Sequence, residues 1–308
     1  MKHNLKITLL LILMFFIAQL IGLFVINQYS PVSKELTSPN GTVINVTSYN
    51  LPYGYDPPKS EPGVNLVSII VAIGMAILIM LLLMTIKAES FLRAWFFVVV
   101  TIAIGITFTS LSPKISFMPW ISLAIAIPLA FLKVYKRNLI VHNLTELIIY
   151  PGIAAIISPL LNFLGIVVLF VVISIYDIYA VWHSGFMQKM AKYQMEKLRL
   201  FSGFFVPYIS KEQRKLIEKM KKSRKANKKI KINVALLGGG DIVFPIILAG
   251  VVLQKWGLIP ALFISLGATI ALSLLFYFSE KKKFYPAMPF ISAGCFLALG
   301  IDYLFRLI

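Results

Sequence analysis

Two aspartates stand out in this sequence, because each lies within a long apolar stretch. Asp177 belongs to LFVVISIYDIYAVW, and Asp241 belongs to NVALLGGGDIVFPIIL, directly after three glycines. A charged side chain at the centre of a membrane helix costs about 3 kcal/mol on insertion scales, so each aspartate requires a reason. The two stretches flank one long basic segment, and elements adjacent in sequence commonly pack side by side. We therefore expect the two carboxyl groups, both near or past mid-span, to face each other in a poorly solvated site.

A buried pair of carboxyl groups has a specific acid–base chemistry. Burial disfavours the charged form of each group, and repulsion prevents both from ionising together, so the pair shares one proton. One carboxylate can then act as a general base on a water molecule while the other acts as an acid, as in aspartic proteases. The glycines before Asp241 weaken the helix and leave room for a second backbone to come close. A substrate that has been unwound requires such room. The same two groups could instead form a proton relay in a transporter or an ion channel.

Two further acids lie within apolar stretches. Asp302 precedes Arg306 by four residues near the end of the chain, which is the spacing of a local ion pair on a helix. Glu146 follows His142 by one helical turn in the most polar of the stretches. The side chains of Glu146 and His142 could face the bundle or a wet cavity. A structural hydrogen-bonding role and a supporting functional role are therefore both open for them.

The composition identifies the class of protein that must position these groups. Of the 308 residues, 59% are hydrophobic and 14% are charged, which leaves too little polar surface for a soluble enzyme and excludes a disordered chain. Runs of about 20 apolar residues predict membrane-spanning helices. We predict an all-α membrane protein with nine such helices, over residues 6–27, 66–86, 94–111, 117–133, 139–157, 164–182, 233–254, 257–279 and 286–306.

The distribution of basic residues predicts how these helices are oriented. If the loops are assigned alternately to two sides, one side holds 25 Lys and Arg residues and the other holds five. Cytoplasmic loops carry the excess, so we predict a cytoplasmic N-terminus and a C-terminus outside the cell membrane. Residues 183–231 hold 15 of the 25 and are predicted to form a basic cytoplasmic loop. This loop separates a six-helix part (1–182), with Asp177, from a three-helix part (232–308), with Asp241.

Three short motifs in the predicted helices resemble the signature of a known family. Tyr176-Asp177 is similar to a YD motif, and Gly238-Gly239-Gly240-Asp241 is similar to a GxGD motif with Gly239 at the variable position. Pro286-Ala287-Met288-Pro289 is similar to a PAL motif, with Met288 in place of leucine. Together they resemble presenilin and signal peptide peptidase, the intramembrane aspartyl proteases. The resemblance runs from the second predicted helix to the C-terminus.

The resemblance implies an endopeptidase that cleaves transmembrane segments of other proteins, with Asp177 and Asp241 as its catalytic dyad. The remaining motif residues would shape the site and hold an extended substrate: Tyr176, Gly238, Gly239, Gly240, Pro286, Ala287 and Met288. Methionine and leucine have similar volumes, so we expect the departure at Met288 to be tolerated.

The predicted orientation matches the presenilin branch of this family, which favours substrates whose N-terminus lies outside. The short loops resemble archaeal homologues, which act without accessory subunits. In presenilin the loop between the sixth and seventh helices is cut during maturation. The apolar Phe204-Phe205-Val206 is either such a cleavage site or a patch that rests on the membrane.

The expected partners are the lipid bilayer and transmembrane substrates. No cofactor or metal is expected, because the sequence has three histidines and one cysteine, Cys295, without the spacing of a metal site. Nucleic acid is not expected either, despite a net charge of +18, because the sequence contains no recognisable nucleic-acid-binding motif. A chaperone that binds membrane helices without cleaving them is a third possibility beside the protease and the carrier.

Overall fold

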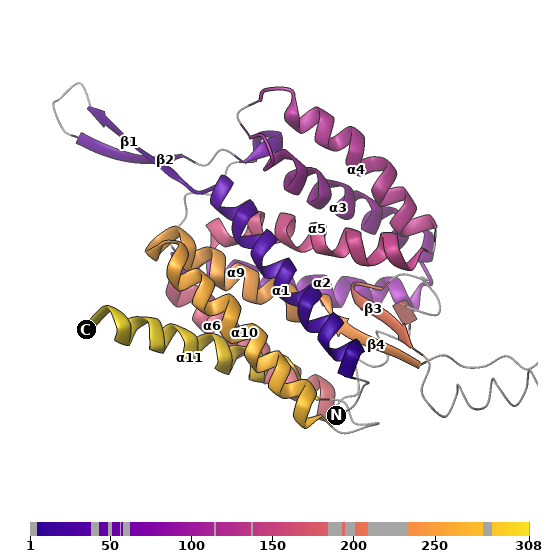
Figure 1. Cartoon of the computed structure of the whole chain (residues 1–308). Coiled ribbons are helices and arrows are strands. Elements are labelled where there is room, and N and C mark those ends of the chain that lie inside the picture. Colours follow the sequence, from indigo (N-terminus) through magenta and orange to yellow (C-terminus); the bar gives the residue numbers. More distant parts are fainter. Residues whose placement is uncertain are drawn as a thin grey trace, which may run out of the picture.

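The computed structural model describes residues 5–37, 43–48, 51–55, 57, 62–113, 115–136, 138–183, 193–194, 201–208, 233–279 and 285–307. Within these ranges, nine helices are long and apolar enough to cross a membrane (Figure 1). They are α1 (Leu5–Gln28), α2 (Pro62–Thr85), α3 (Glu89–Thr109), α4 (Met118–Tyr135), α5 (Leu139–Ile157), α6 (Phe163–Trp182), α9 (Gly239–Trp256), α10 (Leu258–Phe278) and α11 (Met288–Leu307). The prediction of a helical membrane protein with nine spans is confirmed for this part of the chain.

Two antiparallel hairpins complete the described fold. Strands β1 (Val32–Thr37) and β2 (Val43–Ser48) pair after α1. Strands β3 (Gly203–Tyr208) and β4 (Asn233–Gly238) pair across the basic segment, most of which lies outside the described residues. The two hairpins lie at opposite sides of the helices in Figure 1. Two short 3-10 turns, Pro52–Gly54 and Ser158–Leu160, follow β2 and α5.

The predicted boundaries agree with the helices to within two residues except at three starts. The second helix begins at Pro62 rather than at residue 66. The third helix starts at Glu89 rather than at residue 94, and an acidic residue in the first turn suits the positive end of the helix dipole. The predicted helix over 233–254 is wrong at its start, because residues 233–238 form β4 and α9 begins at Gly239. Glycine is a poor helix former, and β3 satisfies backbone groups of the strand that precedes it. Asp241 consequently lies in the first turn of α9 and not near mid-span.

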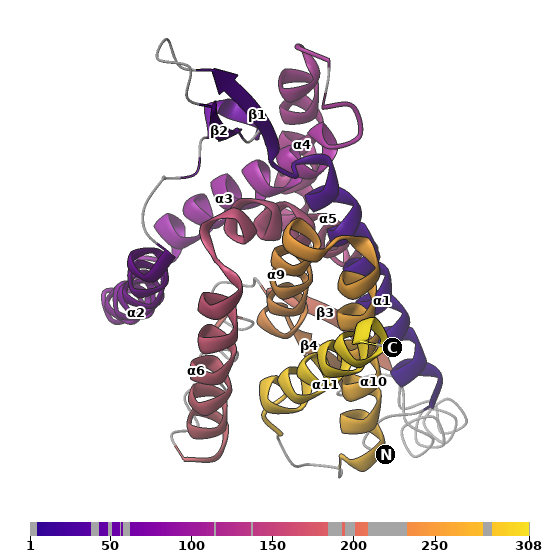
Figure 2. The same cartoon turned by 90° about the vertical axis from the view of Figure 1, so that its left-hand side faces the viewer.

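The helices gather around α9. It packs against α1, α5, α6, α10 and α11, while α3, α4 and α5 form a second group that packs together. Figure 2 shows α9 near the middle of the molecule and α2 standing apart from it. Among the residues of α2 whose burial the structure describes, none in its candidate membrane span is buried, whereas α9 is buried along most of its length.

Helix α1 fixes α9 through a line of close contacts. The fully buried Gln19 donates a hydrogen bond from Nε2 to the Ile242 carbonyl at 3.1 Å, one residue after Asp241. One turn further, a side chain at Gly22 would collide with Ile246, so the two helices approach closely there because position 22 carries no side chain. The first turn of α9 is therefore braced by a helix that lies more than 200 residues earlier in the chain.

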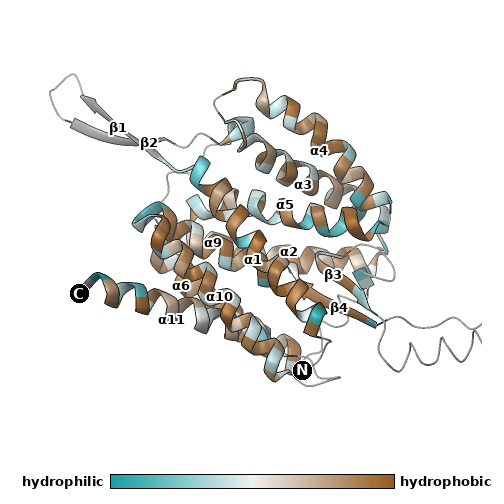
Figure 3. Ribbon diagram, viewed as in Figure 1, coloured by the Kyte–Doolittle hydropathy of each residue, from teal (hydrophilic) through white to brown (hydrophobic). Residues whose placement is uncertain are grey.

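The outer surface suits a lipid environment. Large apolar side chains are exposed along the outer faces of the helices, and Figure 3 shows hydrophobic residues covering most of the helical ribbon. A continuous apolar surface of this extent is unfavourable in water and favourable in a bilayer. The polar groups that enter the helical region are mostly paired, as at Tyr29, whose hydroxyl donates to the Ile106 carbonyl at 2.7 Å.

Candidate active site

Asp177 lies on α6 and is 4% exposed. Its Oδ2 accepts a hydrogen bond at 3.0 Å from the backbone N–H of Met288. Met288 is the first residue of α11, and the first N–H groups of a helix have no partner within the helix itself. The Asp177 carboxyl group therefore caps α11 from a different helix. This contact brings the YD motif against the PAL-like segment, which lies 111 residues later.

Asp241 lies at the start of α9. The chain leaves β4 at Gly238 and turns into α9, so Asp241 is the third helical residue and its carboxyl group turns back toward Gly238. Helices α6 and α9 pack together, and α11 packs against both. The helices that carry or follow the three motifs thus pack together, although the motifs are far apart in the sequence.

The other motif residues differ in their placement. Pro286 and Met288 are buried, and Ala287 between them is half-buried at the start of α11. Tyr176 adjoins Asp177, but its side chain is 39% exposed. Gly240 is exposed and has only Phe244 within 4 Å of the position that a side chain would take.

Gly239, at the variable position of the motif, is tightly enclosed. A Cβ atom there would lie 2.7 Å from both the Tyr150 hydroxyl and the Ser202 hydroxyl. Tyr150 is fully buried on α5 and packs edge-on against Phe204, with ring centroids 6.2 Å apart. Sequence reasoning did not identify Tyr150, because nothing local distinguishes a tyrosine that faces the site from one that faces lipid.

The β3–β4 hairpin was also missed. Gly203 pairs with Gly238 and Tyr208 with Asn233, and the Gly239 N–H donates to the Ser202 carbonyl at 3.2 Å, which extends the pairing to the first residue of α9. The segment Phe204-Phe205-Val206 does not rest on the membrane as a surface patch, because Phe204 is fully buried within the protein. Each segment contains a short apolar run, FFV in GFFVPY and VALL in NVALLG, with glycine at one end of the segment, and this was the available signal.

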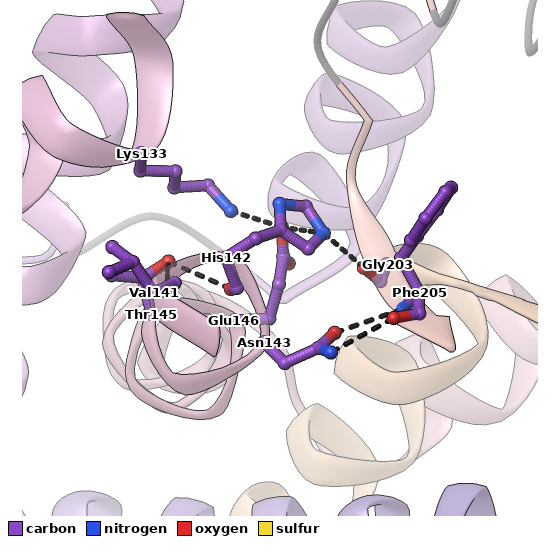
Figure 4. Close-up of polar contacts among 8 residues, drawn as sticks. All are labelled: Lys133, Val141, His142, Asn143, Thr145, Glu146, Gly203 and Phe205. Carbon is purple, nitrogen blue, oxygen red and sulfur yellow. Dashed lines mark hydrogen bonds and ion pairs between the residues drawn. The ribbon is translucent and has the colours of Figure 1, made fainter. Parts of the chain in front are cut away.

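Polar residues of α5 lie beside this hairpin (Figure 4). Glu146 forms a buried ion pair with Lys133 of α4, and His142 Nε2 lies 3.8 Å from the same Glu146 oxygen. The prediction of a local ion pair at the C-terminal helix is confirmed, since Arg306 Nε lies 2.9 Å from Asp302 Oδ2. Among the described residues, no three His, Cys, Asp or Glu side chains cluster as metal ligands would.

Comparisons with known proteins identify a family and a fold. A family model described as signal-peptide peptidase, presenilin aspartyl protease, matches residues 48–308. Two solved structures of a presenilin family intramembrane aspartate protease, in C222 and P2 crystal forms, have the same fold. The C222 structure is 19% identical with a TM-score of 0.60, and the match covers 97% of this chain and 99% of that chain. The P2 structure is 16% identical with a TM-score of 0.59 and 96% coverage of both chains. A search of curated proteins gave no match.

Proposed function

Because the chain belongs to the signal-peptide peptidase and presenilin family of aspartyl proteases, it is a multi-pass intramembrane aspartic endopeptidase, and we propose that Asp177 and Asp241 are its catalytic pair. The observation that carries the proposal is that the helices of the two aspartates pack together and against α11. Asp177 of α6 accepts the Met288 N–H at the start of α11, and Asp241 lies in the first turn of α9. The family implies membrane-protein substrates that are cleaved within the bilayer.

In the proposed mechanism, the pair works with one shared proton. The ionised carboxylate removes a proton from a water molecule between the two groups while the water oxygen attacks the peptide carbonyl carbon. The protonated carboxyl group donates its proton to the carbonyl oxygen, which gives a gem-diol. In the second step one carboxyl group protonates the amide nitrogen and the C–N bond breaks. The other group takes a hydroxyl proton, so the pair ends with the one proton with which it began.

Two helix N-termini support the negative charge of the pair. Asp241 lies within the first turn of α9, and the Met288 N–H that Asp177 accepts belongs to the first residue of α11. Unpaired N–H groups and the helix dipole favour an anion at such positions. The anionic member of the pair is thereby stabilised even though little water reaches it.

The free edge of β4 is a suitable binding surface for an unwound substrate. Alternate residues of β4 face β3, so the N–H and C=O groups of Val234 and Leu236 point to the other edge, which has no strand partner among the described residues. A substrate segment that pairs there as an extended strand would pass alongside Asp241. This is consistent with the chemistry, because a peptide bond within a helix must be unwound before water can attack it.

A cleavage assay with purified protein in detergent tests the proposal. Asp177→Asn and Asp241→Asn should each abolish cleavage of a tagged single-span substrate, with thermal unfolding as the check that each variant is folded. Asp302→Asn is the matched control and should cleave normally. It removes a carboxylate that also lies on a membrane helix but is paired with Arg306. Cleavage at the wild-type rate by either Asn variant of the pair would refute the dyad. Ion or proton flux through liposomes without cleavage would favour the carrier instead.

We further propose a cytoplasmic N-terminus, a C-terminus outside the cell membrane, and activity without accessory subunits. The asymmetry of 25 against five basic residues supports the orientation. In this arrangement 183–231 is a cytoplasmic segment between a six-helix part and a three-helix part. Protease protection of terminal tags in sealed vesicles is the direct measurement, and an N-terminal tag exposed on the outside would contradict the orientation.

A further inference from the structure

The outer edge of β3 is closed by side chains of a membrane helix. In an antiparallel pair, alternate residues direct both backbone groups to the same edge. The Gly239 N–H donates to the Ser202 carbonyl, so the even-numbered residues from 202 to 208 face β4 and the odd-numbered ones face outward. An unpaired outer edge would leave these backbone groups without partners inside the protein, which is unfavourable.

Helix α5 supplies the missing partners (Figure 4). Asn143 donates from Nδ2 to the Phe205 carbonyl at 2.9 Å, and its Oδ1 accepts the Phe205 N–H at 3.0 Å. His142 Nε2 lies 2.9 Å from the Gly203 carbonyl, which can only accept, so Nε2 carries the hydrogen. The third outward residue, Pro207, has no N–H to satisfy. The Asn143 carboxamide thus substitutes for one peptide group of a third strand.

A buried ion pair holds this part of α5 against α4. The side chains of Lys133 and Glu146 are each 1% exposed and contact each other, and Glu146 Oε1 also lies 3.8 Å from His142 Nε2. An unpaired charge at this depth would be strongly unfavourable, so the pair restricts how α5 can move relative to α4. Because α5 also packs on β3 and α9, its polar side chains hold the hairpin in one position relative to α9.

We propose that His142 and Asn143 are positioning residues for Asp241, acting through the hairpin. The connection has three steps: α5 side chains hold the outer edge of β3, β3 pairs with β4, and β4 continues into the turn at Gly239 that carries Asp241. The proposal deepens the proposed function and rests on the catalytic role of Asp241. It also gives Glu146 a role, which is to support the helix that carries both positioning residues.

The test compares two variants that lie two residues apart on α5. Asn143→Leu removes both hydrogen bonds to Phe205 with little change in volume. Thr145→Val is the matched control, because Thr145 is buried nearby but its hydroxyl bonds only to the Val141 and His142 carbonyls of its own helix. Active sites are titrated with an aspartyl-protease transition-state analogue, so that kcat is expressed per active site. A merely structural role would lower the number of active sites and leave kcat per site unchanged.

We expect Asn143→Leu to lower kcat per active site about ten-fold, since small displacements of a catalytic group have effects of this order or larger. Thr145→Val should stay within about two-fold of the wild type, consistent with a contact inside one helix. A normal kcat per site for Asn143→Leu, or an equal loss for Thr145→Val, would overturn the proposal. If Asp241→Asn is inactive while Asn143→Leu is normal, this inference fails and the proposed function stands; an active Asp241→Asn refutes the function itself.

Asn143→Asp provides a second readout, which is the pH dependence of its kcat relative to the wild type. This readout does not require the variant and the wild type to be folded to the same extent. A protonated carboxyl group has one donor and one acceptor and can replace the carboxamide, whereas a carboxylate cannot donate to the Phe205 carbonyl. The ratio of variant to wild-type kcat should therefore fall as pH rises. The neighbouring titratable groups on the packed elements are His142, Glu146, Tyr150, Lys133, Asp241 and Tyr208. The wild type carries all of them, so effects that they have on both proteins alike cancel in the ratio. A ratio that does not change with pH would contradict the role of the Asn143 donor.

Discussion

The enclosed position of Gly239 gives a quantitative prediction. Replacement by alanine places a Cβ atom 2.7 Å from the Tyr150 Oη and 3.0 Å from Tyr150 Cε1, whereas ordinary contacts begin near 3.4 Å. The Ser202 hydroxyl is equally close, but Ser202 is exposed and can rotate away. Tyr150 is fully buried against Phe204 and cannot move freely. The chain at residue 239 must therefore shift by about 0.7 Å, the difference between 3.4 and 2.7 Å.

This displacement occurs two residues before Asp241. Overpacking of this kind costs about 1–3 kcal/mol, offset in part by about 1 kcal/mol for the better helix propensity of alanine. A shift of this size at a catalytic group lowers rates by roughly ten- to a hundred-fold. We therefore expect Gly239→Ala to reduce kcat by about that factor and to lower the stability by no more than about 2 kcal/mol.

A double-mutant cycle with Tyr150→Phe measures the contact directly. The substitution removes the closest fixed atom, so Gly239→Ala should be less harmful in the Tyr150→Phe background, with a coupling energy of about 1 kcal/mol. The assays are thermal unfolding in detergent and cleavage per titrated active site. Additive effects of the two substitutions, or full activity of Gly239→Ala alone, would refute the steric reasoning. Gly257→Ala would not serve as a control, because its backbone φ of +91° makes any side chain unfavourable there.

Three other predictions follow from buried polar groups. Glu146→Leu should destabilise the protein by roughly 3–5 kcal/mol because it leaves Lys133 buried without its partner, and adding Lys133→Met should restore much of the loss in thermal unfolding. Gln19→Met should lower kcat about three-fold, because it removes one hydrogen bond to the Ile242 carbonyl. It should not lower the melting temperature, because it also removes the Gln19 Oε1 atom, which is buried without a partner. Gln254→Met, which alters the other end of α9, should leave kcat unchanged in the same assay. Finally, kcat/KM should show a bell-shaped pH profile, since both carboxyl groups are protonated at acidic pH and both are ionised at alkaline pH; a flat profile with rate-limiting chemistry would exclude the shared proton.

The membrane helices could be predicted from the sequence because the signal is local. A run of about 20 apolar residues is sufficient for a membrane-spanning helix, whatever it later packs against. The same holds for the Asp302–Arg306 pair, since a spacing of four residues on one helix fixes the distance between two side chains. The three motifs were also readable, because each consists of adjacent residues, and their resemblance to a family indicated that they act together.

The tertiary structure decided how those motifs meet and what supports them. The segment 233–238 is apolar enough for a helix, but a short apolar run forms a strand when a partner strand is available, and β3 lies 25 or more residues earlier in the chain. The contact of Asp177 with Met288, the pairing of Lys133 with Glu146 and the bonds of Asn143 to Phe205 each join different elements. Such partners are set by the rotation and depth of packed helices. These depend on the whole set of side chains at the interfaces, so no local pattern in the sequence encodes them.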